Sequence, residues 1–300
     1  MNLQFLVDGA LTGAMIGLGA IGVTLTYSIL RFANFAHGEF IAWGAYFALG
    51  VASAIGWLVA GLAPAIGPFS FGWSVVLALL VAMPLTGLLA LALDWALFGR
   101  LRAASPITVV MASFGASMTL RSLAEFLFTS SPAYFSRDLQ IAVRVGGVRV
   151  TPDQMALCAM AAALVLGLHM LLTRTQTGRA MRAVSENPAL ARVAGIDVDR
   201  VIKVTWFLGA ALAAASGVMA GLIVQIRPFM GFDLLLPLFA AAILGGIGSV
   251  PGALVGGLIV GLAEAGAAAT IGAQWRAAAA FIVLIVMLLA RPTGLFGARE

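Results

Sequence analysis

The chain has 300 residues, of which 62% are hydrophobic and 10% are charged, and its formal net charge is +5. Because soluble domains carry roughly 25% charged residues, this composition excludes a water-soluble globular protein and indicates an integral membrane protein. The basic residues are scattered over short segments, which argues against a nucleic-acid-binding protein. The single cysteine, Cys158, excludes a disulfide framework, and no Cys/His cluster predicts a metal site.

Nine apolar segments follow one another along the chain, most of them near the length of about 20 residues that a membrane span needs. We therefore predict an all-α protein: a single polytopic transmembrane bundle over residues 1–300, with about eight to ten helices and with broken or re-entrant segments. The opening residues have no basic stretch, so we expect the first segment to stay as a span rather than to be cleaved as a signal peptide. The expected spans are 10–30, 40–60, 73–98, 107–128, 155–172, 204–224, 234–247, 253–269 and 277–290.

The distribution of Lys and Arg predicts the orientation. With an external N-terminus, eleven basic residues fall in cytoplasmic segments and five in external ones, and basic residues accumulate on the cytoplasmic side. We therefore expect a periplasmic N-terminus and a cytoplasmic C-terminus in the cell inner membrane. The cytoplasmic set is Arg31, Arg100, Arg102, Arg174, Arg179, Arg182, Arg192, Arg200, Lys203, Arg291 and Arg299, and the external set is Arg137, Arg144, Arg149, Arg227 and Arg276.

Asn34, His37 and Glu39 form the first polar group, between the first and second expected spans. Polar groups near a span are costly unless they are satisfied. Asn34 can cap the helix that follows, and Glu39 lies near the positive N-terminal end of that helix. Two interpretations stay open: a device that starts the helix, or a gate in a translocation pathway near the cytoplasmic mouth.

Ionisable residues inside later spans are further candidates, because a charge within the membrane marks a functional site or a neutralised pair. Arg121 and Glu125 are four residues apart on one helix face, so they can form an intramembrane pair. Glu264 has no partner nearby in the sequence. It could belong to the pathway or to a contact between helices.

Between the fourth and fifth expected spans, residues 141–150 alternate apolar and basic side chains around Gly146 and Gly147. This pattern predicts a two-stranded hairpin with a glycine turn. We expect it on the external face, where it is either a small surface loop or a contact for a soluble partner.

Residues 174–203 interrupt the apolar chain with mixed charges. We expect Thr177-Gly178 to end one helix and residues 179–185 to form a short helix. Asn187 should then cap a short helix that has Pro188 in its first turn, and Gly195 should end it in the left-handed conformation. Asp197 or Asp199 should cap the next span. From the residues alone, this segment is either a docking site for a partner or an amphipathic connector held by membrane lipid.

Glycine-rich segments in the first span and near the end of the chain predict close helix packing of the small-xxx-small type, in Gly9xxxGly13xxxGly17 and in Gly252xxxGly256. The stretch 245–252 should break its helix. A broken helix exposes backbone groups that could bind a polar substrate, so Gly245, Gly246 and Gly248 are candidates for the pathway.

Three stretches resemble one known family, in order along the chain: ANFAHGEFIAWGAY (33–46), GRAMRAVSENPALARVAGIDVDRVI (178–202) and AAILGGIGSVPGALVGGLIVGLAE (241–264). They are similar to the permease subunits of branched-chain amino acid ABC importers, a hydrophobic amino acid uptake family, and to the shorter Liv H type of the pair. The resemblance implies a type II ABC importer-like permease that is not an enzyme and has no cofactor of its own.

The same resemblance implies four partners: a second permease of the Liv M type, two ATPase subunits that bind ATP, and a periplasmic substrate-binding protein. No GxxxxGK[ST] phosphate loop occurs in this chain, which agrees with ATP binding elsewhere. The segment 174–203 would then be a cytoplasmic coupling loop that docks on an ATPase. The expected coupling residues are Arg179, Arg182, Ala183, Val184, Glu186, Asn187, Pro188, Leu190 and Arg192.

The expected function is transport of branched-chain or related hydrophobic amino acids across the inner membrane. One alternative is the same type of permease for amides, urea or aromatic carboxylates. The other is a ten-helix secondary transporter of metabolites, although no repeat of one half of the chain in the other is evident.

Overall fold

The described chain is mostly α-helical in a computed structural model, which describes residues 4–136, 140–145, 147–291 and 293–297. Arg137, Gly146 and Arg299, which entered the expectations above, lie outside the described residues. The helices are α1 (Gln4–Leu30), α2 (His37–Leu58), α3 (Trp73–Ala96), α4 (Pro106–Phe128), α5 (Pro152–Arg174), α6 (Gln176–Glu186), α7 (Pro188–Val193), α8 (Val198–Ile223), α9 (Met230–Gly245), α10 (Val250–Thr270) and α11 (Arg276–Ala290). Short 3-10 turns occur at Ala60–Leu62, Phe98–Leu101 and Ala273–Trp275.

Eight helical segments of the described chain are long and apolar enough to cross a membrane: α1, α2, α3, α4, α5, α8, α10 and Ala273–Ala290, which includes α11. A ninth apolar helix, α9, has 16 residues and is shorter than a full span, as its sequence predicted. The expectation of a polytopic all-α bundle is confirmed. The protein is a multi-pass membrane protein.

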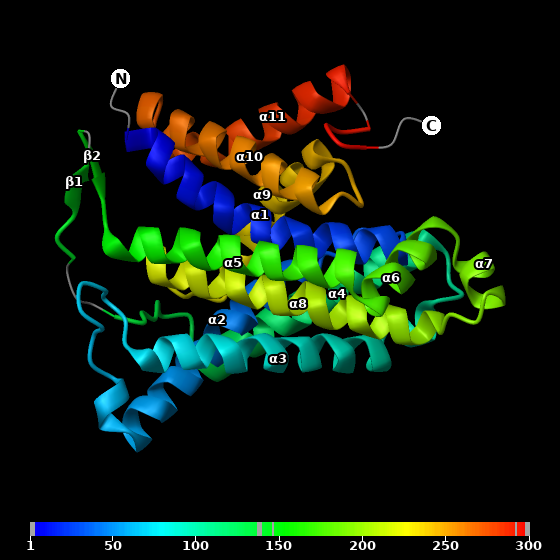
Figure 1. The fold of residues 1–300 in the computed structure, drawn as a ribbon, viewed down its shortest axis with the longest axis horizontal. Coiled ribbons are helices and arrows are strands. Elements are labelled where there is room, and N and C mark those ends of the chain that lie inside the picture. Colours follow the sequence, from blue (N-terminus) through cyan, green and yellow to red (C-terminus); the bar gives the residue numbers. More distant parts are fainter. Residues whose placement is uncertain (1–3, 137–139, 146, 292, 298–300) are drawn as a thin grey trace.

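The bundle has two distinct ends (Figure 1). At one end lie the N-terminal end of α1 and an antiparallel hairpin of β1 (Val143–Val145) and β2 (Val148–Val150), in which Val143 pairs with Val150. At the other end lie α6, α7 and the C-terminal end of the chain. The predicted hairpin is therefore confirmed, and its strands lie opposite the α6–α7 end.

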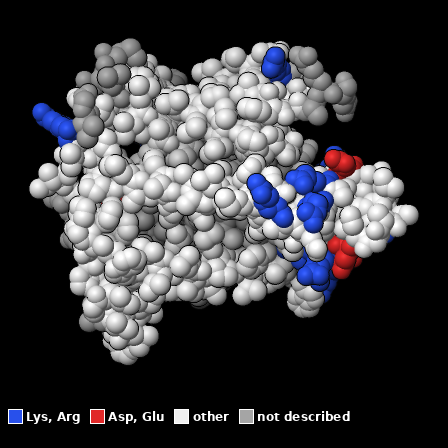
Figure 2. All heavy atoms as spheres, viewed as in Figure 1, with Lys and Arg blue, Asp and Glu red and all other residues white. Residues whose placement is uncertain are grey.

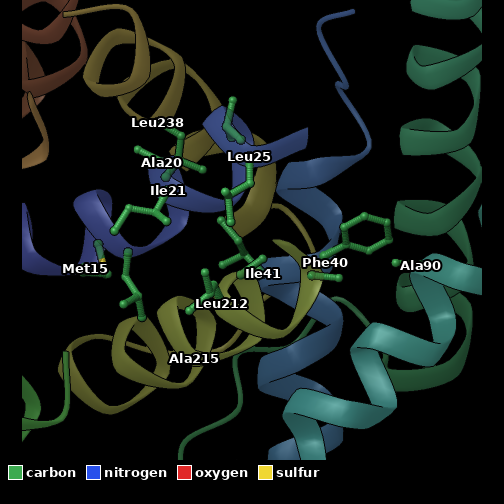
Figure 3. Packing of buried hydrophobic residues seen from close by; sticks show 14 of the residues in the cluster. Met15, Ala20, Ile21, Leu25, Phe40, Ile41, Ala90, Leu212, Ala215 and Leu238 are labelled. Carbon is green, nitrogen blue, oxygen red and sulfur yellow. The ribbon is translucent and has the colours of Figure 1, made fainter. Parts of the chain in front are cut away.

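The core lies where α1, α2, α8 and α9 meet. Figure 3 shows Met15, Ile21 and Leu25 of α1 directed toward Ile41 of α2 and Leu212 of α8. Such side chains are removed almost completely from the surface, and a well-packed interior of this kind fixes the helices relative to one another.

Glycines let α1 and α10 approach until their backbones touch. A Cβ atom added to Gly261 would lie 2.3 Å from the nitrogen of Gly13, and one added to Gly257 would lie 2.4 Å from the Cα of Gly17. The predicted small-xxx-small contact along α1 is thus a seam with α10. It joins the beginning of the chain to its end.

Helices α2 and α9 also meet at glycine, close to where each begins. A Cβ atom on Gly231 would lie 2.0 Å from the carbonyl oxygen of Gly38, and one on Gly38 would lie 2.5 Å from the carbonyl oxygen of Gly231. Because Gly38 and His37 are buried in the bundle, the N-terminal ends of two helices converge in its interior. The first polar group of the sequence, Asn34, His37 and Glu39, therefore lies inside the bundle.

Candidate functional site

The 174–203 loop folds into two short helices whose ends are set by local capping. The Thr175 hydroxyl accepts a hydrogen bond from the backbone N–H of Gly178 at the start of α6. The Asn187 side chain accepts from the backbone N–H groups of Ala189 and Leu190 at the start of α7. Asp197 caps α8 through the N–H of Arg200. The predicted caps at Asn187 and Asp197 are confirmed, as is the left-handed Gly195, whose φ is +83°.

One expectation for this loop is wrong. Thr177 and Gly178 do not end a helix, because α5 already ends at Arg174 and α6 continues through both residues. Gly178 is needed for the crossing of the two helices, since a Cβ atom there would lie 2.2 Å from the carbonyl oxygen of Leu172. The glycine therefore marks a close approach between helices rather than a helix end.

The exposed face of the loop differs from what the sequence indicated. Val184 is buried against the chain's own bundle, with 1% of its surface exposed, so its side chain is not available to another subunit. By contrast, Leu190 is 66% exposed and Val193 is 87% exposed, both on α7. Val193 was missed, although it stands three residues after Leu190 and so on the same side of a helix.

Charged side chains lie at the same end of the bundle as these apolar residues. Figure 2 shows blue and red atoms gathered at the α6–α7 end, while the sides of the bundle carry almost no charge on this face. Arg179, Arg182, Glu186 and Arg192 are all exposed there, whereas Ala183 is half-buried. An apolar centre with a charged rim is the usual composition of a protein-docking surface.

Two arginines join this loop to the rest of the bundle. The guanidinium of Arg31, at the end of α1, donates a hydrogen bond to the carbonyl oxygen of Ser185 in α6. The guanidinium of Arg102 pairs with Asp94 of α3 at 2.9 Å and with Asp199 of α8. The loop is therefore connected to the helices on both sides of it.

A second polar site lies inside the bundle, and we call it the buried polar cluster: Asn34, His37, Glu39, Ser117 and Arg121. All five residues are at most 6% exposed. The side-chain oxygen of Asn34 accepts a hydrogen bond from the N–H of Ala36 at 3.1 Å, in the turn before α2. The expected cap of α2 by Asn34 is wrong, because the N-cap residue is Ala36 and no side chain bonds to the first turn there. The His37 ring donates through Nε2 to the carbonyl oxygen of Gly19 in α1 at 3.2 Å.

Glu39 is the partner of Arg121. Nη2 of Arg121 lies 3.1 Å from Oε1 of Glu39, and the Ser117 hydroxyl donates to the same oxygen at 2.9 Å. The expected pair between Arg121 and Glu125 is therefore wrong: the arginine bonds across to α2, and Glu125 has no ion pair within the described residues. The geometry explains this, because Arg121 is buried on the α2 side of α4, whereas Glu125 is half-exposed.

Aromatic side chains of α9 close the cluster. The Arg121 guanidinium lies 4.4 Å from the ring centre of Phe232 and 5.0 Å from that of Phe229, which are cation–π distances. Phe35 packs against Phe239 of α9 with ring centres 5.7 Å apart. The cluster thus joins α2, α4 and α9, which are far apart in the sequence.

Three atoms of the cluster have no hydrogen-bond partner among the described residues: Nδ2 of Asn34, Nδ1 of His37 and Oε2 of Glu39. A buried polar atom without a partner is costly, and in a native protein it marks a place where a ligand, a water or a second conformation completes the bonding. They do not all face one space, because His37 bonds toward α1, whereas Glu39 bonds toward α4. Oε2 of Glu39, beside Arg121, can accept a hydrogen bond from a polar solute.

The remaining pathway candidates lie elsewhere. Gly245, Gly246 and Gly248 form the predicted break between α9 and α10, with φ of +95° at Gly246 and +94° at Gly248. The break is covered by the end of the chain, because the N–H of Leu295 donates to the carbonyl oxygen of Leu244. It therefore lies at the α6–α7 end of the bundle, beside the C-terminal segment.

Glu264 is buried in a third place. It lines a cavity of about 420 Å³ at the hairpin end, together with Asp8, Thr12 and Arg276. The structure therefore separates Glu264 from the Asn34–Glu39 group instead of joining them in one site. Within the described ranges, no group of three His, Cys, Asp or Glu residues could hold a metal ion.

The chain resembles known membrane permeases over almost its full length. Residues 5–290 match the family described as branched-chain amino acid transport system / permease component. The high-affinity branched-chain amino acid transport system permease protein LivH of Escherichia coli K12 is 32% identical over 99% of this chain and 96% of its own. BraD of Pseudomonas aeruginosa, named likewise, is 31% identical over the same shares, and a probable LivH of Methanocaldococcus jannaschii is 28% identical over 98% and 92%.

Proposed function

The chain belongs to the family of branched-chain amino acid transport system permease components, and from this premise we propose that it moves branched-chain or related hydrophobic amino acids through the inner membrane as part of an ATP-driven importer. The observation that carries this proposal is the exposed patch of Leu190 and Val193 at a charged bundle end. Exposed apolar side chains beside charged ones are typical of a surface that another subunit covers.

ATP is bound by other subunits in this proposal, since the chain has no phosphate-binding loop. Two ATPases dock at the α6–α7 end, a second permease of the Liv M type completes the membrane part, and a periplasmic binding protein delivers the solute at the hairpin end. The N-terminus is accordingly periplasmic and the C-terminus cytoplasmic. The family relationship and the distribution of basic residues support this arrangement.

The docking contact consists of Leu190 and Val193, ringed by Arg179, Arg182, Glu186 and Arg192. Ala183 lies at its edge, and Asn187 with Pro188 fixes the start of α7. Closure of the ATPases on ATP pushes this loop. We place the moving part of the pathway at the buried polar cluster, because the unpartnered oxygen of Glu39 could bond to a passing solute and the cluster connects three helices.

Reconstituted vesicles provide the test. The complex is isolated through an affinity tag on this chain, placed in vesicles, and assayed for uptake of radiolabelled leucine with and without ATP. We expect ATPase subunits to copurify and uptake to need ATP. Uptake by this chain alone, driven by an ion gradient, would favour the secondary transporter, and competition by amides, urea or aromatic carboxylates in place of leucine would change the substrate class.

The docking surface is tested in the same vesicles by Leu190→Glu and by a bulky residue at position 183, Ala183→Trp. Placing a charge at the centre of the apolar contact, or overfilling its edge, should reduce transport while the chain still folds. The matched control is Leu190→Met, which keeps the apolar contact and should transport normally. Normal coupled transport by both disruptive variants would remove the docking assignment.

A further inference from the structure

Arg31 occupies an unusual backbone conformation at the junction between α1 and α2. Its φ is +60°, and within the described residues Thr129 alone among the other non-glycine residues also has a positive φ. A side chain in the left-handed region is strained, and it persists where surrounding contacts hold it in place. The question is therefore what holds Arg31, and what would follow from its release.

One contact joins its side chain to the 174–203 loop. The guanidinium donates to the carbonyl oxygen of Ser185, in the last turn of α6. The last carbonyls of a helix lack partners in their own helix and carry partial negative charge, so a cation there makes a favourable contact. Arg31 therefore directly follows the last residue of α1, and its side chain bonds to a carbonyl oxygen in the last turn of α6.

The backbone after Arg31 leads directly into the buried polar cluster. Phe32 stacks on Phe98 with ring centres 5.4 Å apart, and the N–H of Phe35 donates to the Ser113 hydroxyl of α4 at 3.1 Å. Asn34 is three residues after Arg31, and His37 is six residues after Arg31. A change of φ at Arg31 redirects this short segment and so moves the cap of α2.

We propose that Arg31 is a positioning residue that transmits displacement of α6 to the buried polar cluster. While α6 is in place, the bond to Ser185 holds Arg31 in the left-handed conformation and keeps Asn34 against the start of α2. When α6 is displaced, the bond breaks, the backbone of Arg31 returns to a right-handed conformation, and the segment 32–36 shifts. The proposal rests on the docking of an ATPase at α6 and α7, and it names the residue through which that docking acts.

The two properties of Arg31 can be separated by substitution. Arg31→Asn removes the guanidinium but keeps a residue that tolerates the left-handed conformation. Arg31→Lys keeps a cation able to bond the Ser185 carbonyl oxygen. The matched control is Arg291→Asn at the same end of the bundle, because the Arg291 side chain is exposed and makes no hydrogen bond or ion pair within the described chain.

The first measurement is leucine taken up per ATP hydrolysed in vesicles that contain the complete complex. We expect Arg31→Asn to lower this ratio about tenfold, a typical size for coupling between two sites. ATP hydrolysis itself should continue. Arg31→Lys and Arg291→Asn should stay close to the unmodified complex.

The second measurement reports movement, which a merely structural role would not affect. Cys158 is the chain's one cysteine, so Cys158→Ala gives a background in which Ala33→Cys can be labelled alone. We expect the rate of maleimide labelling at position 33 to change when a non-hydrolysable ATP analogue is added. This response should disappear when Arg31→Asn is also present.

The outcomes separate this inference from the function proposed above. If the unmodified complex shows no ATP-dependent uptake, the proposed function fails first. If that complex transports and Arg31→Asn keeps both the uptake ratio and the labelling response, the inference is overturned. Failure of Arg31→Asn to assemble would make Arg31 a structural residue and would also overturn it.

Discussion

The two polar regions of this protein use similar residues in opposite environments. In the 174–203 loop, charged side chains are exposed and their helix caps are local, as with Asn187 and the N–H groups of Ala189 and Leu190. In the buried polar cluster, the partners come from distant segments, as with Glu39 and Arg121. Solvent can replace a lost contact in the first region but not in the second.

This difference separates two roles. A loop whose short helices are held by local caps keeps its own structure when it is displaced, and its bond to Arg31 passes that displacement to the end of α1, which suits a surface that another subunit pushes. A cluster that ties α2, α4 and α9 together can change only if those helices change, which suits a gate.

Removing one member of the buried ion pair should be the most damaging change. Arg121→Met leaves Glu39 buried without its cation, and breaking such a pair from one side typically costs about 3–5 kcal/mol. We expect a large fall in the thermal stability of the purified protein in detergent. The double variant Glu39→Gln/Arg121→Met removes both charges and should regain much of that stability.

A transport assay of the double variant tests whether the pair of Glu39 and Arg121 serves transport as well as stability. The double variant should be folded yet inactive, because the carboxylate that could bond to a passing solute is gone. If the double variant were both stable and fully active in leucine uptake, the cluster would only stabilise the packing of the helices and would not be part of the pathway.

Next in size is the same substitution made at the two asparagines. Asn34→Asp places an unpaired charge at a residue that is 3% exposed, so we expect a loss of several kcal/mol, as for other unpaired buried charges. Asn187→Asp keeps a good helix cap in an exposed loop and should change stability by less than about 0.5 kcal/mol. Thermal unfolding of the two variants, compared with the unmodified chain, tests the contrast directly; equal losses would contradict it.

The glycine contact between α2 and α9 should give an intermediate effect. Gly38→Ala places a Cβ atom 2.5 Å from the carbonyl oxygen of Gly231, which is backbone and cannot turn aside. Overfilling of this kind typically costs about 1–3 kcal/mol. The matched control is Gly50→Ala on the same helix, where a Cβ atom would meet nothing within 4 Å. Stability and leucine uptake should fall for the first variant and hold for the second.

The sequence predicted those parts of the molecule that depend on neighbouring residues. Hydropathy located the spans, and the identities of Asn187, Pro188, Gly195 and Asp197 predicted the short helices of the loop, because caps and left-handed turns act within four residues. The hairpin followed from alternation in the same way. These signals need no knowledge of how the helices pack.

The buried polar cluster could not be predicted in full for the opposite reason. Glu39 and Arg121 are 82 residues apart, and the nearer Glu125 offered an equally good pairing by helical spacing. The choice depends on which face of α4 meets α2, and that face is fixed by tertiary packing such as the bond from Trp43 Nε1 to the Leu120 carbonyl oxygen at 3.1 Å. No local rule distinguishes the two carboxylates.

Glu125→Gln therefore gives the smallest effect and the sharpest check on that choice. Since Glu125 is half-exposed and forms no ion pair within the described chain, removal of its charge should change stability by no more than about 0.5 kcal/mol. Glu39→Gln, the same chemical change on the facing helix, should destabilise the protein strongly and impair leucine uptake. Both variants are measured side by side by thermal unfolding and uptake. If Glu125→Gln were the more harmful of the two, Arg121 would be paired within its own helix, and the contact that joins α2 to α4 would have to come from other side chains.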